Sequence, residues 1–464
     1  EDFYADKTHF ILELLQNAED ALKHGNNTDK TIRFELRQDT LSLRHFGKAF
    51  DEKDVKSICS ISKSTKKLDS TTIGKFGIGF KSVYDFTNSP EIHSGEHHFQ
   101  IKDYVHPFLV DTDVDLKPDE TLIRLPLNDA QRAEIIKKGL TKLNKRTILF
   151  LRHIKAVQWN TDDGGTGKIR RDEEALTSLD TSDFKARKVT ISDQYDRETW
   201  LIFSKKIPLS GGGTAPLEIA FLQEWDEKTK KETIKRITDA NLYTFFPLGK
   251  EKTQLGFLVQ GPFQTTRSRE TVGNNGTWND ELIVKSGQLL LTVLHQFKKK
   301  TGLYLDILNC LPIQDHFFDD PSSYLFSPMA KALLSALQTE ELLPCDNNTF
   351  TSGQNAKLAT KAILDLFSPR SLSELFDTNG THSGWLHRDL NRFNDGGLSR
   401  YLRNRLSVER IDHNDIIPKL TEPFLEKQTA TWMRCLYAFF DKHHQLFKDD
   451  IKKTIPIIRL KTGA

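Results

Sequence analysis

The segment that most restricts the fold of this chain is a glycine-rich run, GKFGIGFKS at residues 74–82. Its three glycines, at i, i+3 and i+5, allow backbone N–H groups to point toward a ligand. A helical pattern follows directly, and a helix N-terminus favours an anion such as phosphate. The run lacks the GK[ST] ending of a Walker loop. The apolar residues between the glycines indicate that the turn also packs on a core.

A second constraint is an amphipathic pattern over residues 8–23, THFILELLQNAEDALK, which predicts a helix. Glu13, Asn17 and Asp20 lie at i, i+4 and i+7, so the three polar side chains share one face. The small side chain of Ala21 continues that face and permits a close approach. Amphipathic helices are common, so this pattern alone does not indicate a functional site. It indicates one only in combination with the glycine-rich run.

The order of the remaining elements predicts an α/β architecture. Two strand patterns, residues 31–38 and 40–46, form a hairpin, and a short helix is expected over 51–61. Strands then follow the glycine-rich turn through residues 121–127. The chain becomes β-rich from about residue 152, has a long helix over about 278–300, and is mostly helical from 311. We therefore expect three domains: 1–155, 156–310 and 311–464.

In order and spacing, residues 13–21 (ELLQNAEDA), residues 74–82 and Thr121 resemble the nucleotide site of the GHKL (Bergerat-fold) ATPases. The branch that it resembles most is that of sacsin-like proteins and ninety-kilodalton heat-shock chaperones, and the resemblance covers residues 8–127. It implies a Bergerat-fold α/β sandwich, a β-rich α+β middle domain and a mostly helical C-terminal region. It also implies Mg²⁺-dependent ATP binding and slow hydrolysis that drives closure between the first two domains.

The resemblance assigns roles to individual residues. Glu13 is implied as the general base for the attacking water, Asn17 as the Mg²⁺ ligand, and Thr121 as a neighbour of the adenine. A water-activating glutamate argues for hydrolysis, because histidine kinases of this superfamily usually lack one. Residues 62–75 are implied to be a mobile lid. The implied nucleotide-contacting residues are Asn17, Asp20, Ala21, His45, Gly47, Ser64, Thr65, Lys66, Gly74, Lys75, Phe76, Gly77, Ile78, Gly79, Phe80 and Thr121.

One position departs from the family pattern. In these families an Asp before the first glycine box accepts a hydrogen bond from the adenine amino group, and here His45 takes its place. A neutral imidazole accepts through one nitrogen and donates through the other. We expect ATP as the nucleotide, and guanine, which presents a carbonyl group there, is not excluded. The alternative is that His45 packs at a strand end and water contacts the base.

A further arginine is expected to act from the middle domain. Residues 254–272, QLGFLVQGPFQTTRSRETV, resemble the loop by which heat-shock chaperones offer an arginine to the γ-phosphate, and that residue is Arg269 here. Ser268 stands where sacsin-like relatives have Asn. An arginine suits phosphate charge, and one from another domain would couple the nucleotide state to domain closure. The alternatives are a surface arginine, or a loop lysine as in topoisomerase and mismatch-repair relatives, which this segment does not contain.

Composition limits the other classes of function. Lys+Arg 66 against Asp+Glu 64 leaves a net charge of +2, so nucleic acid and anionic membranes are not expected partners. No apolar run reaches 18 residues, no signal peptide is recognised, and the four cysteines are widely spaced, which together predict a cytoplasmic or nuclear protein that is not secreted. The expected partners are nucleotide, a protein client or partner subunit, and a second copy through N-terminal segments absent here.

Two rival hypotheses accompany the ATPase hypothesis. One is a nucleotide sensor or scaffold that does not hydrolyse its ligand, and the other is a DNA-associated GHKL clamp. Within the ATPase hypothesis, the module would serve chaperone-like remodelling, regulation or defence inside a larger protein, which rests on analogy. The chain begins at Glu1 close to the base-bearing helix, so we expect it to be cut from a longer protein at both ends.

Overall fold

The structure is a computed structural model that describes residues 9–60, 79–111, 115–209, 212–266, 270–273, 277–298, 302–377, 383–391 and 397–442. The chain divides into two compact units, Glu1–Leu289 and Leu290–Ala464, and the division falls inside α4 (Thr277–Phe297).

The first unit starts with the helix that the amphipathic pattern predicts, α1 (His9–His24), and the predicted hairpin, β1 (Thr31–Arg37) with β2 (Thr40–His45). The next elements are α2 (Glu52–Cys59), η1 (Phe80–Asp85), β3 (Glu91–Ser94), β4 (His97–Lys102), β5 (His106–Leu109), β6 (Thr121–Pro126), α3 (Ala130–Lys142) and η2 (Lys145–Ile148). The predicted helix after the glycines is thus a six-residue 3-10 turn, η1. Its valine and aromatic residues favour helix weakly, and Pro90 follows soon after.

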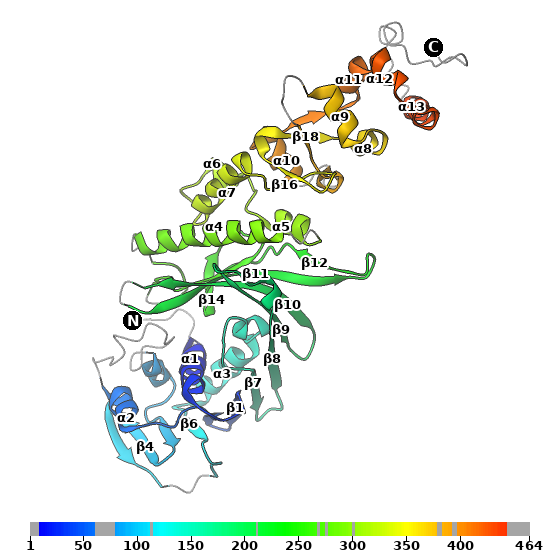
Figure 1. Ribbon diagram of the computed structural model, residues 1–464. Coiled ribbons are helices and arrows are strands. Elements are labelled where there is room, and N and C mark those ends of the chain that lie inside the picture. Colours follow the sequence, from blue (N-terminus) through cyan, green and yellow to red (C-terminus); the bar gives the residue numbers. More distant parts are fainter. Residues whose placement is uncertain are drawn as a thin grey trace. The chain divides into compact units, whose positions relative to one another are not determined.

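The core of this part forms between three helices and one face of the strands (Figure 1). Alternate residues of β1 and β2 are buried, as expected for strands covered on one face. They pack with Phe10 and Leu14 of α1, Ile58 of α2 and Ile136 of α3. The ring of Phe10 lies 4.4 Å from that of Phe86. This layer of helices on a sheet packs α1 against the strands. The candidate functional site lies on α1 and at the end of β2.

The sheet continues from the first strands into the β-rich region. β7 (Ala156–Thr161) pairs in parallel with β1. Further strands extend the sheet: β8 (Thr166–Ala175), β9 (Lys185–Ser192), β10 (Arg197–Pro208), β11 (Thr214–Asp226), β12 (Lys231–Lys235), β13 (Asn241–Thr244), β14 (Phe246–Lys252) and β15 (Leu258–Gln260). The order is β14-β13-β15-β11-β10-β9-β8-β7-β1-β2-β6-β3-β4-β5, with β12 on β11. Among the described residues of the first unit, these strands therefore form one 15-stranded sheet.

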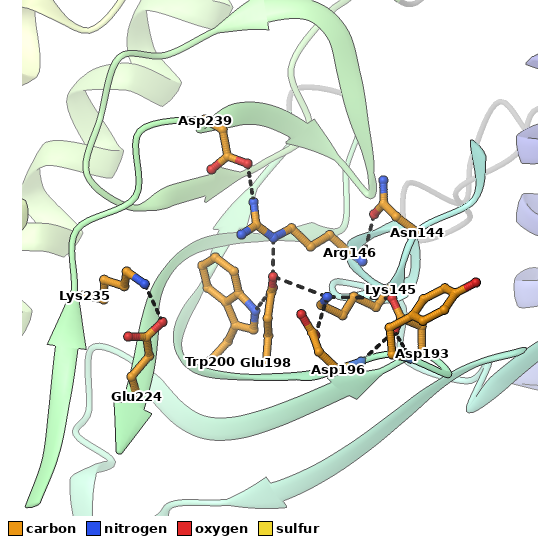
Figure 2. A network of polar contacts seen from close by, with 11 residues as sticks. Asn144, Lys145, Arg146, Asp193, Asp196, Glu198, Trp200, Glu224, Lys235 and Asp239 are labelled. Atoms are coloured by element: carbon orange, nitrogen blue, oxygen red, sulfur yellow. Dashed lines mark hydrogen bonds and ion pairs between the residues drawn. The ribbon is translucent and has the colours of Figure 1, made fainter. Parts of the chain in front are cut away.

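A polar network attaches η2 to the strands that follow (Figure 2). Arg146 Nε donates to Glu198 Oε2 at 2.8 Å, and its NH1 donates to Asp239 Oδ2 at 2.8 Å. Trp200 Nε1 donates to the same Glu198 oxygen at 3.0 Å, and the Arg146 guanidinium lies 5.2 Å from the Trp200 ring centre. Lys145 Nζ lies 2.5 Å from Asp196 Oδ1. These contacts hold the turn before β7 onto β10, with Glu198 and Trp200 on the buried side and Asp196 and Asp239 largely exposed.

The second unit is mainly helical, with two small sheets. Its helices, after the end of α4, are α5 (Tyr304–Cys310), α6 (His316–Asp319), α7 (Ser327–Thr339), α8 (Lys361–Leu366), α9 (Pro369–Phe376), α10 (Gly397–Asn404), α11 (His413–Ile416), α12 (Glu422–Glu426) and α13 (Ala430–Lys442). β16 (Leu343–Pro344) pairs with β17 (Phe350–Thr351), and β18 (Ala356–Ala359) lies between β19 (Gly384–Trp385) and β20 (Glu409–Ile411). Its short 3-10 turns are η4 (Gly353–Asn355), η5 (Arg388–Asn391) and η6 (Ile417–Lys419), while η3 (Thr177–Leu179) belongs to the first unit, between β8 and β9.

The predicted fold class is confirmed: an α/β N-terminal region, a β-rich region and a helical C-terminal region follow one another. The small sheets β16–β17 and β18–β20 were not predicted from the sequence, because strands of two to four residues leave little periodic signal. Within the described ranges, no helix has the length and apolar character that crossing a membrane requires.

Candidate functional site

The helix α1 is fixed at its C-terminal end and along its buried face. Lys30 Nζ donates to the carbonyl oxygens of Leu22 and Gly25, each at 3.1 Å, which satisfies acceptors at the helix end. Glu19, 1% exposed, accepts backbone N–H bonds from Arg152 (2.6 Å), His153 (2.9 Å) and Ile154 (2.7 Å). The helix is therefore tied to the segment that leads into β7.

Glu19 is a positioning residue that the sequence analysis missed. A signal was present, since Glu19 lies one helical turn from Leu15 and Leu22, on the apolar face of the pattern. A glutamate on a core-facing stripe requires hydrogen-bond partners inside the protein. Which backbone groups supply them depends on the tertiary fold.

The structure brings Glu13 and Gly79 together, as two of the predicted site residues. The Glu13 side chain is 3% exposed, and a Cβ atom placed on Gly79 would overlap Glu13 Oε2 and lie 3.0 Å from its Cδ. Gly79 in turn accepts hydrogen bonds from Ser82 N (3.1 Å) and Ser82 Oγ (2.6 Å). The glycine at this position therefore makes room for the carboxylate, and the start of η1 is held beside it.

A second close approach joins α1 to the turn after β2. A Cβ on Gly47 would lie 2.6 Å from Ala21 Cβ and 2.8 Å from the Ala21 carbonyl carbon. Lys48 N donates to Ala21 O at 2.9 Å. A Cβ on Gly25 would lie 2.8 Å from the Gly47 carbonyl carbon. The small residues predicted at 21 and 47 thus allow two backbone segments to touch.

His45 ends β2 in the row of core-facing residues that begins with Leu41 and Leu43. It is 3% exposed, and its Nδ1 accepts a hydrogen bond from Gly47 N at 3.1 Å. Burial lowers the pKa of His45 to about 4 from its ordinary value of 6.5. The imidazole is therefore neutral at pH 7. Its acceptor nitrogen, Nδ1, is bonded to the turn that follows β2.

Thr121 lies opposite His45 in the β2–β6 register, so the two side chains are on one face of the sheet. Thr121 is fully buried, and its hydroxyl lies 2.6 Å from Ser94 Oγ. Ser94 Oγ also accepts a hydrogen bond from Phe50 N at 3.0 Å. Two predicted site residues, His45 and Thr121, are therefore adjacent, and Ser94, which the sequence analysis did not single out, lies beside Thr121.

An open cavity of about 1120 Å³ lies along the neighbouring face of α1. Its wall includes Glu13 and Asp20 on the helix, and Gln264 and Thr265 of the β-rich region. Asn17 and Ala21, both half-buried, are not part of its wall, nor are the residues around His45. Glu13 therefore lies between two places, the turn at Gly79 and a cavity shared with the β-rich strands.

Two arginines in the wall of the cavity, Arg152 and Arg187, share a buried carboxylate that the sequence analysis did not find. Arg187 of β9 donates from NH1 to Glu218 Oε1 of β11 at 2.8 Å, and Arg152 forms a short bond to the same oxygen. Burial raises the pKa of Glu218, but the two arginines outweigh it and lower the pKa to about 2. Glu218 is therefore a carboxylate at neutral pH, and its role is to hold the two arginines at the wall.

Several predicted site residues lie outside the described residues. These are Ser64, Thr65, Lys66, Gly74, Lys75, Phe76, Gly77, Ile78 and Arg269. The chain on both sides of Arg269 is described: Thr265 and Val272 form an antiparallel bridge, and Glu270 pairs with Lys250 at 2.7 Å. Phe80 is described and is buried in the core, 2% exposed. Its side chain therefore serves packing.

Among the described residues, no group of three or more His, Cys, Asp or Glu side chains is arranged to hold a metal ion. Asn17 follows Glu13 by one helical turn on α1. An amide oxygen beside a carboxylate offers the hard oxygen ligands that Mg²⁺ prefers. This donor set fits Mg²⁺ only as a partial shell, in which substrate oxygens and water supply the other ligands.

Comparison with known proteins finds similarity to the sacsin domain in the first part of the chain. A family model described as the sacsin domain matches residues 2–115. Residues 2–115, called the sacsin-like domain from here on, are similar to that family over about a quarter of the chain. Human sacsin is 33% identical over 104 residues, which cover 20% of this chain and 2% of that protein. The chaperone protein HtpG of Helicobacter pylori is 32% identical over 107 residues, 18% of this chain and 17% of that protein.

A longer similarity extends beyond the sacsin-like domain. The protein NO VEIN of Arabidopsis thaliana is 27% identical over 327 residues, 64% of this chain and 11% of that protein. The matched regions span only a small part of each of these three relatives. Together the matches support the branch that the motifs indicate, the sacsin-like and heat-shock-chaperone-like branch of the GHKL ATPases.

Proposed function

We propose that the sacsin-like domain binds a Mg²⁺–purine nucleoside triphosphate, hydrolyses it slowly, and couples its nucleotide state to movement against the β-rich region. ATP is the first candidate, because the resemblance to GHKL ATPases implies it. The biological use is chaperone-like remodelling or regulation within a larger protein, and the name of the chaperone protein HtpG supports the first of these. A client protein and a second copy of the chain are the proposed partners.

The contact between Glu13 and Gly79 supports this proposal most directly. Phosphoryl transfer to water requires a positioned base and charge neutralisation more than covalent chemistry. Glu13 is buried on a helix that is fixed at both Lys30 and Glu19, so its carboxylate is held in one place. From there it can orient a water molecule and accept its proton. Asn17 would hold Mg²⁺, which when bound neutralises phosphate charge.

The shared cavity supports the coupling between the two regions. Gln264 and Thr265 line the same cavity as Glu13, and Arg269 follows shortly after them in the chain. An arginine delivered from this segment would add a charged hydrogen-bond donor for phosphate oxygens. Its engagement would draw the β-rich strands toward α1, so that binding and closure are linked.

The test is nucleotide binding by calorimetry, with and without Mg²⁺, together with phosphate release. We expect Glu13→Gln to retain binding and to reduce phosphate release by roughly 10²-fold or more, the usual contribution of a general base. Gly79→Ala should act in the same direction, because its Cβ would displace the Glu13 carboxylate. Glu134→Gln, on the exposed side of α3, is the matched control.

The outcomes separate the hypotheses. Absence of nucleotide binding by the wild-type protein would refute the proposal. Phosphate release that Glu13→Gln leaves unchanged would remove Glu13 as the base. Tight binding without any release would instead identify a nucleotide sensor that does not hydrolyse its ligand.

A further inference from the structure

The two arginines that share Glu218 belong to a larger buried cluster on the strands. Arg171 of β8 is fully buried and forms a short bond to Glu173 of the same strand. Glu173 Oε1 also lies 3.8 Å from Arg187 Nε, and Glu218 pairs with both Arg187 and Arg152. Three guanidinium groups therefore face two carboxylates, so the cluster has one positive charge in excess.

Two other carboxylates near this cluster are already engaged. Asp180 pairs with Lys185 at 3.0 Å, and Glu19 accepts the three backbone N–H bonds described above. Arg187, 5% exposed, has two buried nitrogens, Nε and NH2, for which the described residues supply no hydrogen-bond partner. A buried cation with incomplete pairing is costly, so an anion that reaches the cluster would stabilise it.

The cavity of about 1120 Å³ gives a ligand access to the cluster. Arg152, Arg187 and Glu173 lie in its wall, and the side chain of Arg152 is 33% exposed. Lys185 and Lys206 add exposed ammonium groups to the same wall. The strands therefore give the cavity a basic part.

The same cavity has an apolar part. Leu12, Phe245 and Pro247 are half-buried in its wall. Phe245 has a φ of 71°, a backbone conformation that a bulky residue rarely adopts, and its N–H group donates to the fully buried Gln260 at 3.4 Å. The fold thus holds an aromatic ring at the cavity in spite of local strain.

An acidic part comes from α1, because Glu13 and Asp20 also line the cavity. These carboxylates would repel a ligand that is negatively charged along its whole length. A ligand with its charge confined to one end can place that end on the strands. The cavity therefore suits an anion with an uncharged, apolar body.

We propose that this cavity binds an organic acid whose single carboxylate lies against Arg152 and Arg187 and whose apolar body lies against Phe245. The guanidinium fork matches a carboxylate in geometry. One carboxylate balances the one excess charge, whereas a phosphate monoester, with a charge of about −1.5 to −2 at pH 7, would exceed it. The carboxylate belongs to a small molecule or to an acidic side chain of a peptide, since both offer the same groups.

The proposal goes beyond the proposed function and does not depend on it. The test is therefore a fluorescence titration of the nucleotide-free protein with pyrenebutyrate, and with pyrenebutanol as the uncharged counterpart. Arg152→Gln removes the excess charge, and Arg152→Lys keeps it. Arg170→Gln is the matched control, because Arg170 is exposed on the other face of β8 from Arg171 and is not part of the cavity wall.

We expect the wild-type protein to bind pyrenebutyrate at least about tenfold more tightly than pyrenebutanol. Arg152→Gln should lose this preference, Arg152→Lys should keep part of it, and Arg170→Gln should keep all of it. Equal affinities for the acid and the alcohol in the wild-type protein would overturn the proposal. A preference that persists in Arg152→Gln, or that disappears equally in Arg170→Gln, would overturn it too.

A second measurement needs no variant, in case Arg152→Gln does not fold. Hydrogen–deuterium exchange of the wild-type protein with pyrenebutyrate should show protection in peptides that contain residues 149–155 and β9. Protection confined to other peptides would place the ligand elsewhere and overturn the proposal.

Competition distinguishes the two sources of the carboxylate. The competitors are two acetylated tripeptide amides, Phe-Glu-Phe and Phe-Gln-Phe. Displacement of pyrenebutyrate by the Glu peptide alone would support the site with a peptide as its ligand, and displacement by neither would support it with a small organic acid. Displacement by both peptides alike would show that the charge is not recognised. Stronger displacement by inorganic phosphate than by acetate would overturn the choice of a carboxylate.

Discussion

Lowering the pH should destabilise the first unit through His45. The folded protein holds the pKa of His45 at about 4, because the ring is buried, against 6.5 for an ordinary histidine. Between these values the unfolded chain takes up a proton and the folded protein does not. The stability is therefore fully present above about pH 6.5 and is lost as the pH falls toward 4.

The size of the effect follows from the same two values. One pKa unit corresponds to about 1.4 kcal/mol, so the full loss is about 3 kcal/mol, of which about 2 kcal/mol falls between pH 7 and pH 5. His93, whose pKa burial also lowers to about 4, contributes in the same window. The comparison with His45→Asn removes that contribution, because both proteins contain His93. The packing cost of the smaller side chain is equal at both pH values and cancels too.

The assay is urea unfolding at pH 7 and pH 5, followed by hydrogen–deuterium exchange in peptides that contain β1 and β2. These peptides report the first unit separately from residues 290–464. The wild-type protein should lose about 2 kcal/mol more than His45→Asn between the two pH values. An Asn substitution at His106, on the exposed strand β5, is the control for loss of a histidine. Equal losses in the wild-type protein and His45→Asn would refute the reasoning.

Two further predictions concern packing and buried charge. Gly47→Ala should lower the free energy of unfolding by about 1–3 kcal/mol, because its Cβ would lie 2.8 Å from the backbone of Ala21. Gly249→Ala, where nothing lies within 4 Å of the added Cβ, should leave it unchanged in the same urea titration, and equal effects of the two would contradict the packing argument. Glu218→Gln should cost roughly 3–5 kcal/mol, because the buried Arg187 loses its counter-charge. Since the pKa of Glu218 is about 2 in the folded protein, the wild-type protein should also lose stability as the pH falls from about 4.5 to 2, and a variant that keeps this slope would argue against the assignment.

The local elements of the first unit could be predicted from the sequence. The helix over residues 8–23 and the hairpin that follows it are set by apolar periods of 3.6 and 2, which need only near neighbours in the chain. The same patterns placed Glu13 and Asn17 on one helical face. The motif analysis also identified His45 as a departure from the family pattern, but it left the two tautomers open.

The tertiary structure decided the features that join distant segments. It set Gly79 against Glu13, gave Glu19 its backbone partners before β7, and paired β7 with β1 in parallel. It also chose the His45 tautomer, through the backbone turn that directs Gly47 N–H at the ring. The sequence by itself determined which residue types are present and which face each occupies. Only packing decided which donor meets which acceptor, because those partners are brought together by the burial of a common core.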